Sequence, residues 1–134
     1  MKIDNFMKVF EQQVGYGNPV LEKSFNFSVK ITKFYIKLIK HDYSLNDILK
    51  QLLRSGTSIG ANIAESQEAV SKKDFVNKLA IALKEAKESE YWLKLLKESN
   101  VINENVYNEL HYDCNEILRL LISIIKKLKE KNDF

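Results

Sequence analysis

Residues 45 to 67 contain the feature that most constrains the fold, an apolar helical face interrupted by small residues. Apolar side chains recur there at three- and four-residue steps, at Leu45, Ile48, Leu49, Leu52, Ile59 and Ile63. This spacing places them on one face of an α-helix. Seven of the eight residues from Ser55 to Asn62 are small, including Gly56 and Gly60. Because each glycine destabilises a helix interior by about 1 kcal/mol relative to alanine, the pair indicates close approach of another helix backbone; the alternative is a kink or break near Gly56.

The opposite side of this helix carries a polar ridge. It is formed by Arg54, Ser58, Ala61, Asn62 and Glu65, which fall within about a quarter turn of one another. Exposed helix positions usually hold long side chains that favour helices, and serine and asparagine are not among them. A side that faces water is the ordinary interpretation. We favour a contact surface and predict that Arg54, Ser58, Asn62 and Glu65 meet a neighbouring subunit.

Composition indicates a single all-α domain. The chain has 134 residues, 45% of them hydrophobic, with one proline and four glycines for turns. Its net charge of +3 is too mild for a dedicated nucleic-acid binder, so arguments about partners depend on where the charges lie. Cys114 is the single cysteine, residues 1–10 lack a signal-peptide core, and no run of eighteen apolar residues occurs. We therefore expect a soluble, cytoplasmic protein with no membrane contact.

The first helix is predicted over residues 19–41, after a leader segment of residues 1–18. Asn18 can cap this helix, and Pro19 suits its first position. The side of the helix that adjoins its core-facing side carries a basic stripe, and Glu22 is the single acidic residue of the whole helix. The stripe consists of Lys23, Lys30, Lys33, Lys37 and Lys40, within about 100° of the helix surface.

This basic stripe is the best functional candidate in the chain. A row of lysines can neutralise phosphates without reading sequence. Lysines on the outside of a bundle also keep it soluble, and that interpretation stays open. Because the chain contains no helix-turn-helix, zinc finger or RNA-binding motif, nucleic-acid binding would depend on shape and charge alone.

Two capping boxes predict where the next helices begin. Ser44 with Asp47 starts the second helix, and Ser71 with Asp74 starts the third, which reaches about Lys97. In each pair the first side chain can accept a hydrogen bond from the backbone three residues later.

The last helix opens at a hydrophobic staple around Asn103, formed by Ile102 and Tyr107, and runs to about Lys131. Four long helices joined by short turns predict an antiparallel, up-down-up-down four-helix bundle over residues 19–131.

The apolar surface of the last two helices is wider than one bundle core requires. Apolar residues of the last helix cover roughly 200°, whereas an arc somewhat above 100° would face a core. Ile81 and Trp92 lie on a flank of the third helix, away from its main apolar stripe. We predict that Ile81, Trp92, Leu118 and Ile122 are buried between subunits of a homo-oligomer.

Candidate catalytic and metal-binding residues are few. His111 and Cys114 lie one turn apart, but a buried thiol and a packed imidazole are the favoured interpretation. Neither histidine follows a glutamate by three residues, which excludes the usual di-iron bundle site. Glu90 is expected to form an ion pair at the bundle edge or between subunits, and Tyr91 with Trp92 to pack rather than stack on a base. We expect no enzyme activity, catalytic residue, metal or cofactor.

Several motifs together resemble a known family. They are QLLRSGTSIGANIAE at 51–65, SKKDF at 71–75, ALKEA at 82–86 and ESEYWL at 88–93. In order and spacing they resemble the four-helix-bundle family encoded in 23S rRNA intervening sequences, with a weaker likeness over 21–128. The accessory proteins of diversity-generating retroelements are related to this family.

The resemblance implies a four-helix protomer that assembles into a five-fold ring, a homopentamer, without enzymatic activity. For the retroelement relatives it also implies binding to nucleic acid and to reverse transcriptase. Many members have proline where Gly60 stands and glycine where Ser66 stands. The resemblance therefore does not carry over a kink at Gly60 or a tight turn after Glu65.

The sequence predicts a non-enzymatic oligomeric scaffold or accessory protein. In the first hypothesis it binds RNA or DNA without sequence specificity through the basic stripe. In the second it is a purely structural ring that docks a reverse transcriptase or another protein, and its lysines serve solubility.

Overall fold

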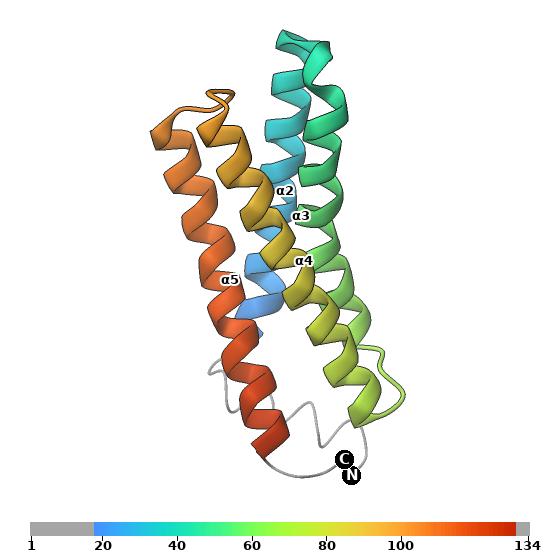
Figure 1. Ribbon diagram of the computed structural model, residues 1–134. Coiled ribbons are helices and arrows are strands. Elements are labelled where there is room, and N and C mark those ends of the chain that lie inside the picture. The colour runs from blue at the N-terminus through green and yellow to red at the C-terminus, as the bar shows by residue number, and fades with distance from the viewer. Residues whose placement is uncertain (1–17, 131–134) are drawn as a thin grey trace.

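The computed structural model describes residues 18–130, and these residues are entirely helical apart from their turns, with no strand (Figure 1). The elements are α2 (Pro19–His41), the short 3₁₀ helix η1 (Tyr43–Leu45), α3 (Asn46–Ser66), α4 (Lys72–Glu98) and α5 (Glu104–Glu130). The predicted all-α fold class is thereby confirmed. Most of the predicted leader segment, residues 1–17, lies outside the described residues.

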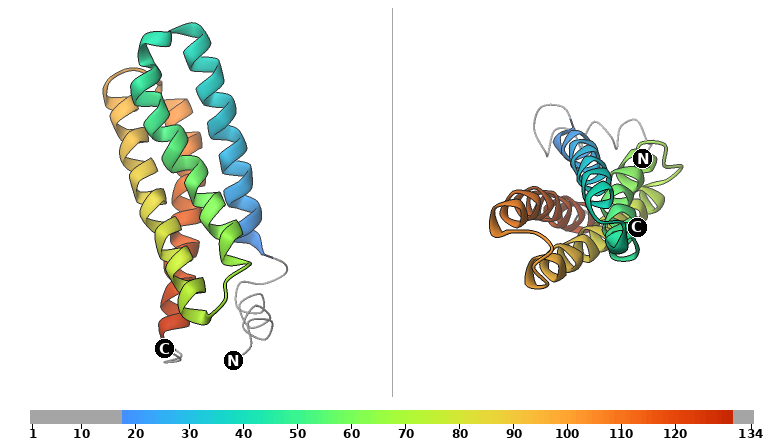
Figure 2. Two further views of the ribbon diagram at one scale, coloured as in Figure 1. Left: turned by 90° about the vertical axis from the view of Figure 1, so that its right-hand side faces the viewer. Right: turned by 90° about the horizontal axis from the view of Figure 1, so that it is seen from above.

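The helices run up, down, up and down, as predicted. The α2–α3 and α4–α5 connections lie at one end of the bundle, and the α3–α4 connection lies at the other (Figures 1 and 2). α3 packs extensively against both α2 and α4, and α4 against α5, whereas α2 and α5 meet less extensively. This arrangement concerns one chain, so the pentameric ring stays a prediction.

Side-chain caps start two helices where the sequence placed them. The Asn18 side chain accepts a hydrogen bond from the Leu21 backbone at 3.2 Å, and Pro19 is the first residue of α2. The Ser71 hydroxyl accepts a hydrogen bond from the Asp74 backbone at 3.0 Å at the start of α4. These bonds satisfy backbone N–H groups that have no partner within the helix.

The predicted Ser44–Asp47 capping box is wrong. The Asp42 carboxylate accepts hydrogen bonds from the Ser44 backbone at 3.0 Å and from its hydroxyl at 2.6 Å, which also lowers the pKa of Asp42. Ser44 lies inside the 3₁₀ turn that Asp42 caps, so α3 begins only at Asn46, preceded by Leu45 without a side-chain cap. An aspartate two residues before a serine competes for this turn geometry.

α3 is one helix through Gly56 and Gly60, so the chain does not break into two shorter helices near Gly56. Both glycines are buried against α2. A Cβ on Gly56 would lie 3.1 Å from the Ile31 side chain, and a Cβ on Gly60 would lie 3.1 Å from the backbone oxygen of Ser24. The absent side chains therefore let the two helix backbones approach closely, as the sequence indicates.

The core is a continuous apolar cluster between the four helices of the described chain. Its largest fully buried side chains are Phe27, Ile31, Leu49, Leu52, Ile59, Ile63, Phe75, Leu79, Leu93, Leu96 and Ile117. Burial of each contributes roughly 1.5–3 kcal/mol relative to exposure, so packing on these faces holds the helices together.

Candidate functional site

The structure divides the predicted basic stripe of α2 into two parts. In the first part, Lys23 lies 3.0 Å from Glu116, and Lys30 lies 2.6 Å from Asp113 and 3.3 Å from Glu109, all on α5. Hydrogen bonds to Glu116 and to Asp113 raise the pKa of Lys23 and of Lys30 respectively. These two lysines join α2 to α5, and their charges are balanced within the chain.

The second part of the stripe keeps its positive charge. Lys33, Lys37 and Lys40 are exposed, and among the described residues no carboxylate lies within ion-pair distance of them. Together with Ile36 and His41 they line a shallow groove on the outer side of α2. The cationic surface that sequence placed along all of α2 is thus confined to its second half.

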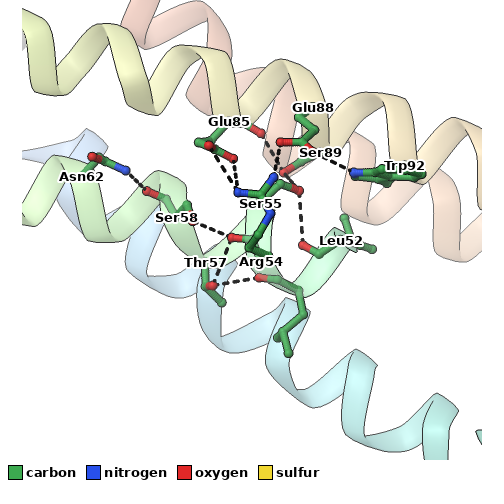
Figure 3. A network of polar contacts seen from close by, with 11 residues as sticks. Leu52, Arg54, Ser55, Thr57, Ser58, Asn62, Glu85, Glu88, Ser89 and Trp92 are labelled. Atoms are coloured by element: carbon green, nitrogen blue, oxygen red, sulfur yellow. Dashed lines mark hydrogen bonds and ion pairs between the residues drawn. The ribbon is translucent and has the colours of Figure 1, made fainter. Parts of the chain in front are cut away.

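The polar ridge of α3 faces α4 (Figure 3). The Arg54 guanidinium forms ion pairs with Glu85, at 3.3 Å, and with Glu88. Its hydrogen bond to Glu88 raises the pKa of Arg54 and lowers that of Glu88. Glu88 also accepts a hydrogen bond from the Trp92 indole nitrogen at 3.3 Å. Arg54 therefore fixes one turn of α3 against two turns of α4.

A buried pair of hydroxyls lies beside this cluster. The Ser89 hydroxyl lies 2.9 Å from the Ser55 hydroxyl and also donates to the Glu85 backbone oxygen at 2.9 Å (Figure 3). Both serine side chains are fully buried, and every buried polar side-chain atom of the described residues has a hydrogen-bond partner. Because both buried hydroxyls need a hydrogen-bond partner, the pair favours the one register of α3 against α4 in which the two side chains meet.

The rest of the ridge is also bonded within its own chain. Ser58 donates to the Arg54 backbone oxygen at 2.6 Å, and Asn62 donates to that of Ser58 at 2.8 Å. Glu65 pairs with Lys78 of α4 at 3.1 Å. These bonds link residues of one protomer, and contact of the ridge with a neighbouring subunit stays a prediction.

The predicted apolar interface residues differ in how much surface they leave. Ile81 on α4 and Ile122 on α5 are 43% and 44% exposed. Trp92 is half-buried, with its ring edge-on to Tyr91. Leu118 is buried in the core of the protomer and offers a second chain little area. Ile81 and Ile122 remain available for the proposed contact.

His111 and Cys114 have separate partners. The Cys114 thiol is buried, donates to the Ala86 backbone oxygen at 3.4 Å, and has its pKa raised to about 12 by burial. His111 instead lies within hydrogen-bond distance of Glu90, at 3.2 Å at the bundle edge, and this contact is an ion pair when His111 is protonated. Within residues 18–130, no group of three or more metal-ligating side chains comes together.

α4 and α5 also form a cleft that the sequence did not predict. It is lined by Lys87, Glu90, Tyr91, Lys94, Tyr107 and His111. Its residues come from two helices, so no single motif reveals it. A partial signal was present in the spacing of Lys87, Tyr91 and Lys94, which recur at four and three residues along one face of α4.

Comparison with known proteins assigns the family. The family model described as 23S rRNA-intervening sequence protein matches residues 18–123. The chain belongs to this family. The description of the family does not state a molecular activity.

A solved structure from Bacteroides thetaiotaomicron VPI-5482, described as a protein with unknown function from the S23 ribosomal protein family, is 50% identical. The match covers 80% of this chain and 98% of that one, with a TM-score of 0.76. No curated protein is similar enough to match. In the described part of the chain, none of the helices combines the length and apolarity needed to cross a membrane.

Proposed function

We propose that this protein is a non-enzymatic, cytoplasmic accessory protein that binds RNA or DNA without reading sequence. The observation that carries the proposal is the exposed cationic groove of Lys33, Lys37 and Lys40 with His41. These lysines have no carboxylate partner within the described chain. A phosphate backbone would supply the missing opposite charge and release counterions on binding.

Lys23 and Lys30 have a smaller part in this proposal than the sequence gave them. A phosphate would have to replace carboxylates at 2.6–3.3 Å from their amines, so much of the gain would be lost. If the remaining three lysines each neutralise one phosphate, binding releases about three counterions per protomer, and affinity falls with salt accordingly. Binding by one chain is therefore expected to be weak.

Repetition in an oligomer would strengthen this weak interaction. We propose the homopentamer that the resemblance implies, supported by the exposed Ile81 and Ile122. Several copies of one groove on a single RNA raise the effective concentration and multiply affinity without any new contact.

A purely protein-binding ring is the second candidate. It is favoured by three exposed apolar residues on α2, Phe25, Val29 and Ile36, of which Phe25 is 66% exposed. In this candidate a reverse transcriptase or another protein covers these three apolar residues, and the lysines serve only to keep the protein soluble.

Fluorescence anisotropy with a structured RNA hairpin and a DNA duplex, between about 50 and 300 mM salt, distinguishes the two candidates. The test variant replaces Lys33, Lys37 and Lys40 by Gln. The matched control replaces Lys73, Lys84 and Lys127, which are also exposed, and removes the same charge. Light scattering on the same samples gives the oligomer mass.

The proposal expects affinity to fall with salt and the test variant to bind at least tenfold more weakly than the control. Equal binding by both variants, or affinity independent of salt, would contradict nucleic-acid binding through α2 and favour the protein-binding ring.

A further inference from the structure

The cleft between α4 and α5 combines a flat aromatic surface with positive charge. Its volume is about 410 Å³, and its lining residues belong to α4 and α5, whereas those of the cationic groove belong to α2. The sequence predicts that Tyr91 packs rather than stacks on a base, but in the structure its side chain is 60% exposed. Lys87 lies four residues before it and Lys94 three residues after it, so the three side chains share one face of α4, and all three line the cleft.

The α5 side of the cleft is held in place by an ordered stack. The Lys97 amine lies 4.6 Å from the centre of the Tyr107 ring, and His111 stacks on Tyr107 at 5.1 Å with 15° between the planes. Beyond His111, Glu90 lies at 3.2 Å. Each member restricts the next, so this wall is preorganised for a ligand.

The cations at the rim have no acidic partner. Among residues 18–130, neither Lys87 nor Lys94 lies within ion-pair distance of a carboxylate, whereas the nearby Lys97 pairs with Glu104 at 3.6 Å. The cleft therefore offers two amines, a largely exposed aromatic ring and the Glu90 carboxylate as a hydrogen-bond acceptor.

We propose that this cleft binds one unpaired nucleotide, with its base stacked on Tyr91 and its phosphate between Lys87 and Lys94. Every nucleobase has a π-face that stacks on an aromatic ring regardless of sequence. An acidic peptide fits less well, because a carboxylate side chain has no flat π-face to stack on the exposed Tyr91 ring. This inference rests on the nucleic-acid binding proposed above but assigns the single-stranded part of the ligand to a separate surface.

Trp92 provides a direct readout. It is the single tryptophan of the chain, and its ring lies edge-on to Tyr91 at 5.0 Å. A base that stacks on Tyr91 should change the Trp92 emission. The probes are a ten-nucleotide oligoadenylate, a ten-base-pair DNA duplex and free AMP.

The variants separate stacking from charge. Tyr91→Ala removes the ring, and Tyr91→Phe keeps it as the matched control. Lys87→Gln with Lys94→Gln removes the amines, and Lys84→Gln is a control on an exposed position of α4 outside the cleft. Circular dichroism of each variant verifies that the helices are retained.

We expect Tyr91→Ala to weaken oligoadenylate binding about tenfold or more, and Tyr91→Phe to change it less than about twofold. The double lysine variant should also weaken binding and reduce its salt dependence, unlike Lys84→Gln. If AMP binds about as tightly as the oligoadenylate, the ligand of the cleft is a free nucleotide. If the oligoadenylate binds and AMP does not, the ligand is a nucleotide within a single strand.

Oligoadenylate binding that is unchanged in both Tyr91→Ala and the double lysine variant would overturn the inference. If the α2 lysine variant loses the duplex while the cleft variants behave as the parent, the proposed function stands and the cleft assignment fails. If the cleft variants lose the single strand while the α2 variant behaves as the parent, the cleft assignment stands and the role of α2 fails.

Discussion

The close approach of α2 and α3 predicts that Gly60→Ala destabilises the bundle even though alanine is the better helix former. A Cβ at this position would lie 3.0 Å from the Ser28 hydroxyl and 3.1 Å from the Ser24 backbone oxygen. The Ser28 hydroxyl donates to that same oxygen at 3.0 Å, and it can rotate away. The oxygen itself belongs to the backbone of α2, so relief requires the helices to separate by a few tenths of an ångström.

The magnitude follows from two opposed contributions. Helix propensity alone would make Gly60→Ala more stable by about 1 kcal/mol. Overpacking of a close contact costs about 1–3 kcal/mol, and we take the upper part of that range because backbone atoms must move. The expected net loss is about 1–2 kcal/mol. At Gly56 the new Cβ would meet the Ile31 side chain, at 3.1 Å, so Gly56→Ala should cost less.

Thermal and urea unfolding followed by circular dichroism measure this difference. They are repeated at two protein concentrations, because dissociation of an oligomer would add to the apparent stability. Ala61→Gly, at an exposed position of the same helix, measures the propensity contribution alone and should cost about 1 kcal/mol. A Gly60→Ala protein as stable as the parent, or more stable, would refute the reasoning, since it would show that α2 does not constrain residue 60.

Three further predictions concern buried or paired groups. Ser89→Ala should cost about 1 kcal/mol, and adding Ser55→Ala should cost less than a second such loss, because both hydroxyls of a 2.9 Å hydrogen bond are then gone; urea unfolding of the double-mutant cycle checks this. Arg54 lowers the pKa of Glu88 below its ordinary value of 4.5, so their stabilisation is present above pH 4.5 and is lost as the pH falls through the lowered pKa. A Tm series from pH 7 to 3 should fall less steeply for Arg54→Met. The buried Cys114 thiol, with its pKa raised to about 12, should react with a disulfide reagent at pH 8 on the order of 100-fold more slowly in the native than in the unfolded protein, and rapid native labelling would contradict its burial.

Much of the fold was predictable because its signals are local. The Asn18 and Ser71 caps each act on a backbone group three residues away, and the apolar periodicity specifies which face of each helix is buried. Ser44 shows the limit of such signals. Its spacing from Asp47 fits a capping box, but Ser44 lies inside a 3₁₀ turn capped by Asp42, and the sequence pattern alone does not rank the two local alternatives.

The lysines of α2 show what depends on register between helices. Lys23 and Lys30 look equivalent to Lys33 and Lys37 in the sequence, yet only the first two lie opposite carboxylates of α5. The partners lie 79 to 93 residues away along the chain, so no periodicity within α2 indicates them.

The sequence by itself determined the helices, their buried faces, and the close approach of another helix to the small residues of α3, because these follow from side-chain shape and hydrogen bonding within a few residues. The structure identified that helix as α2. Only the tertiary structure decided which charges are balanced, that Arg54 pairs with Glu85 and Glu88, and that Tyr91 and His111 share a cleft. Those outcomes depend on how far one helix slides and rotates against the next. Packing of the whole core sets the relative position of the helices. The ion pairs and the cleft follow from that position.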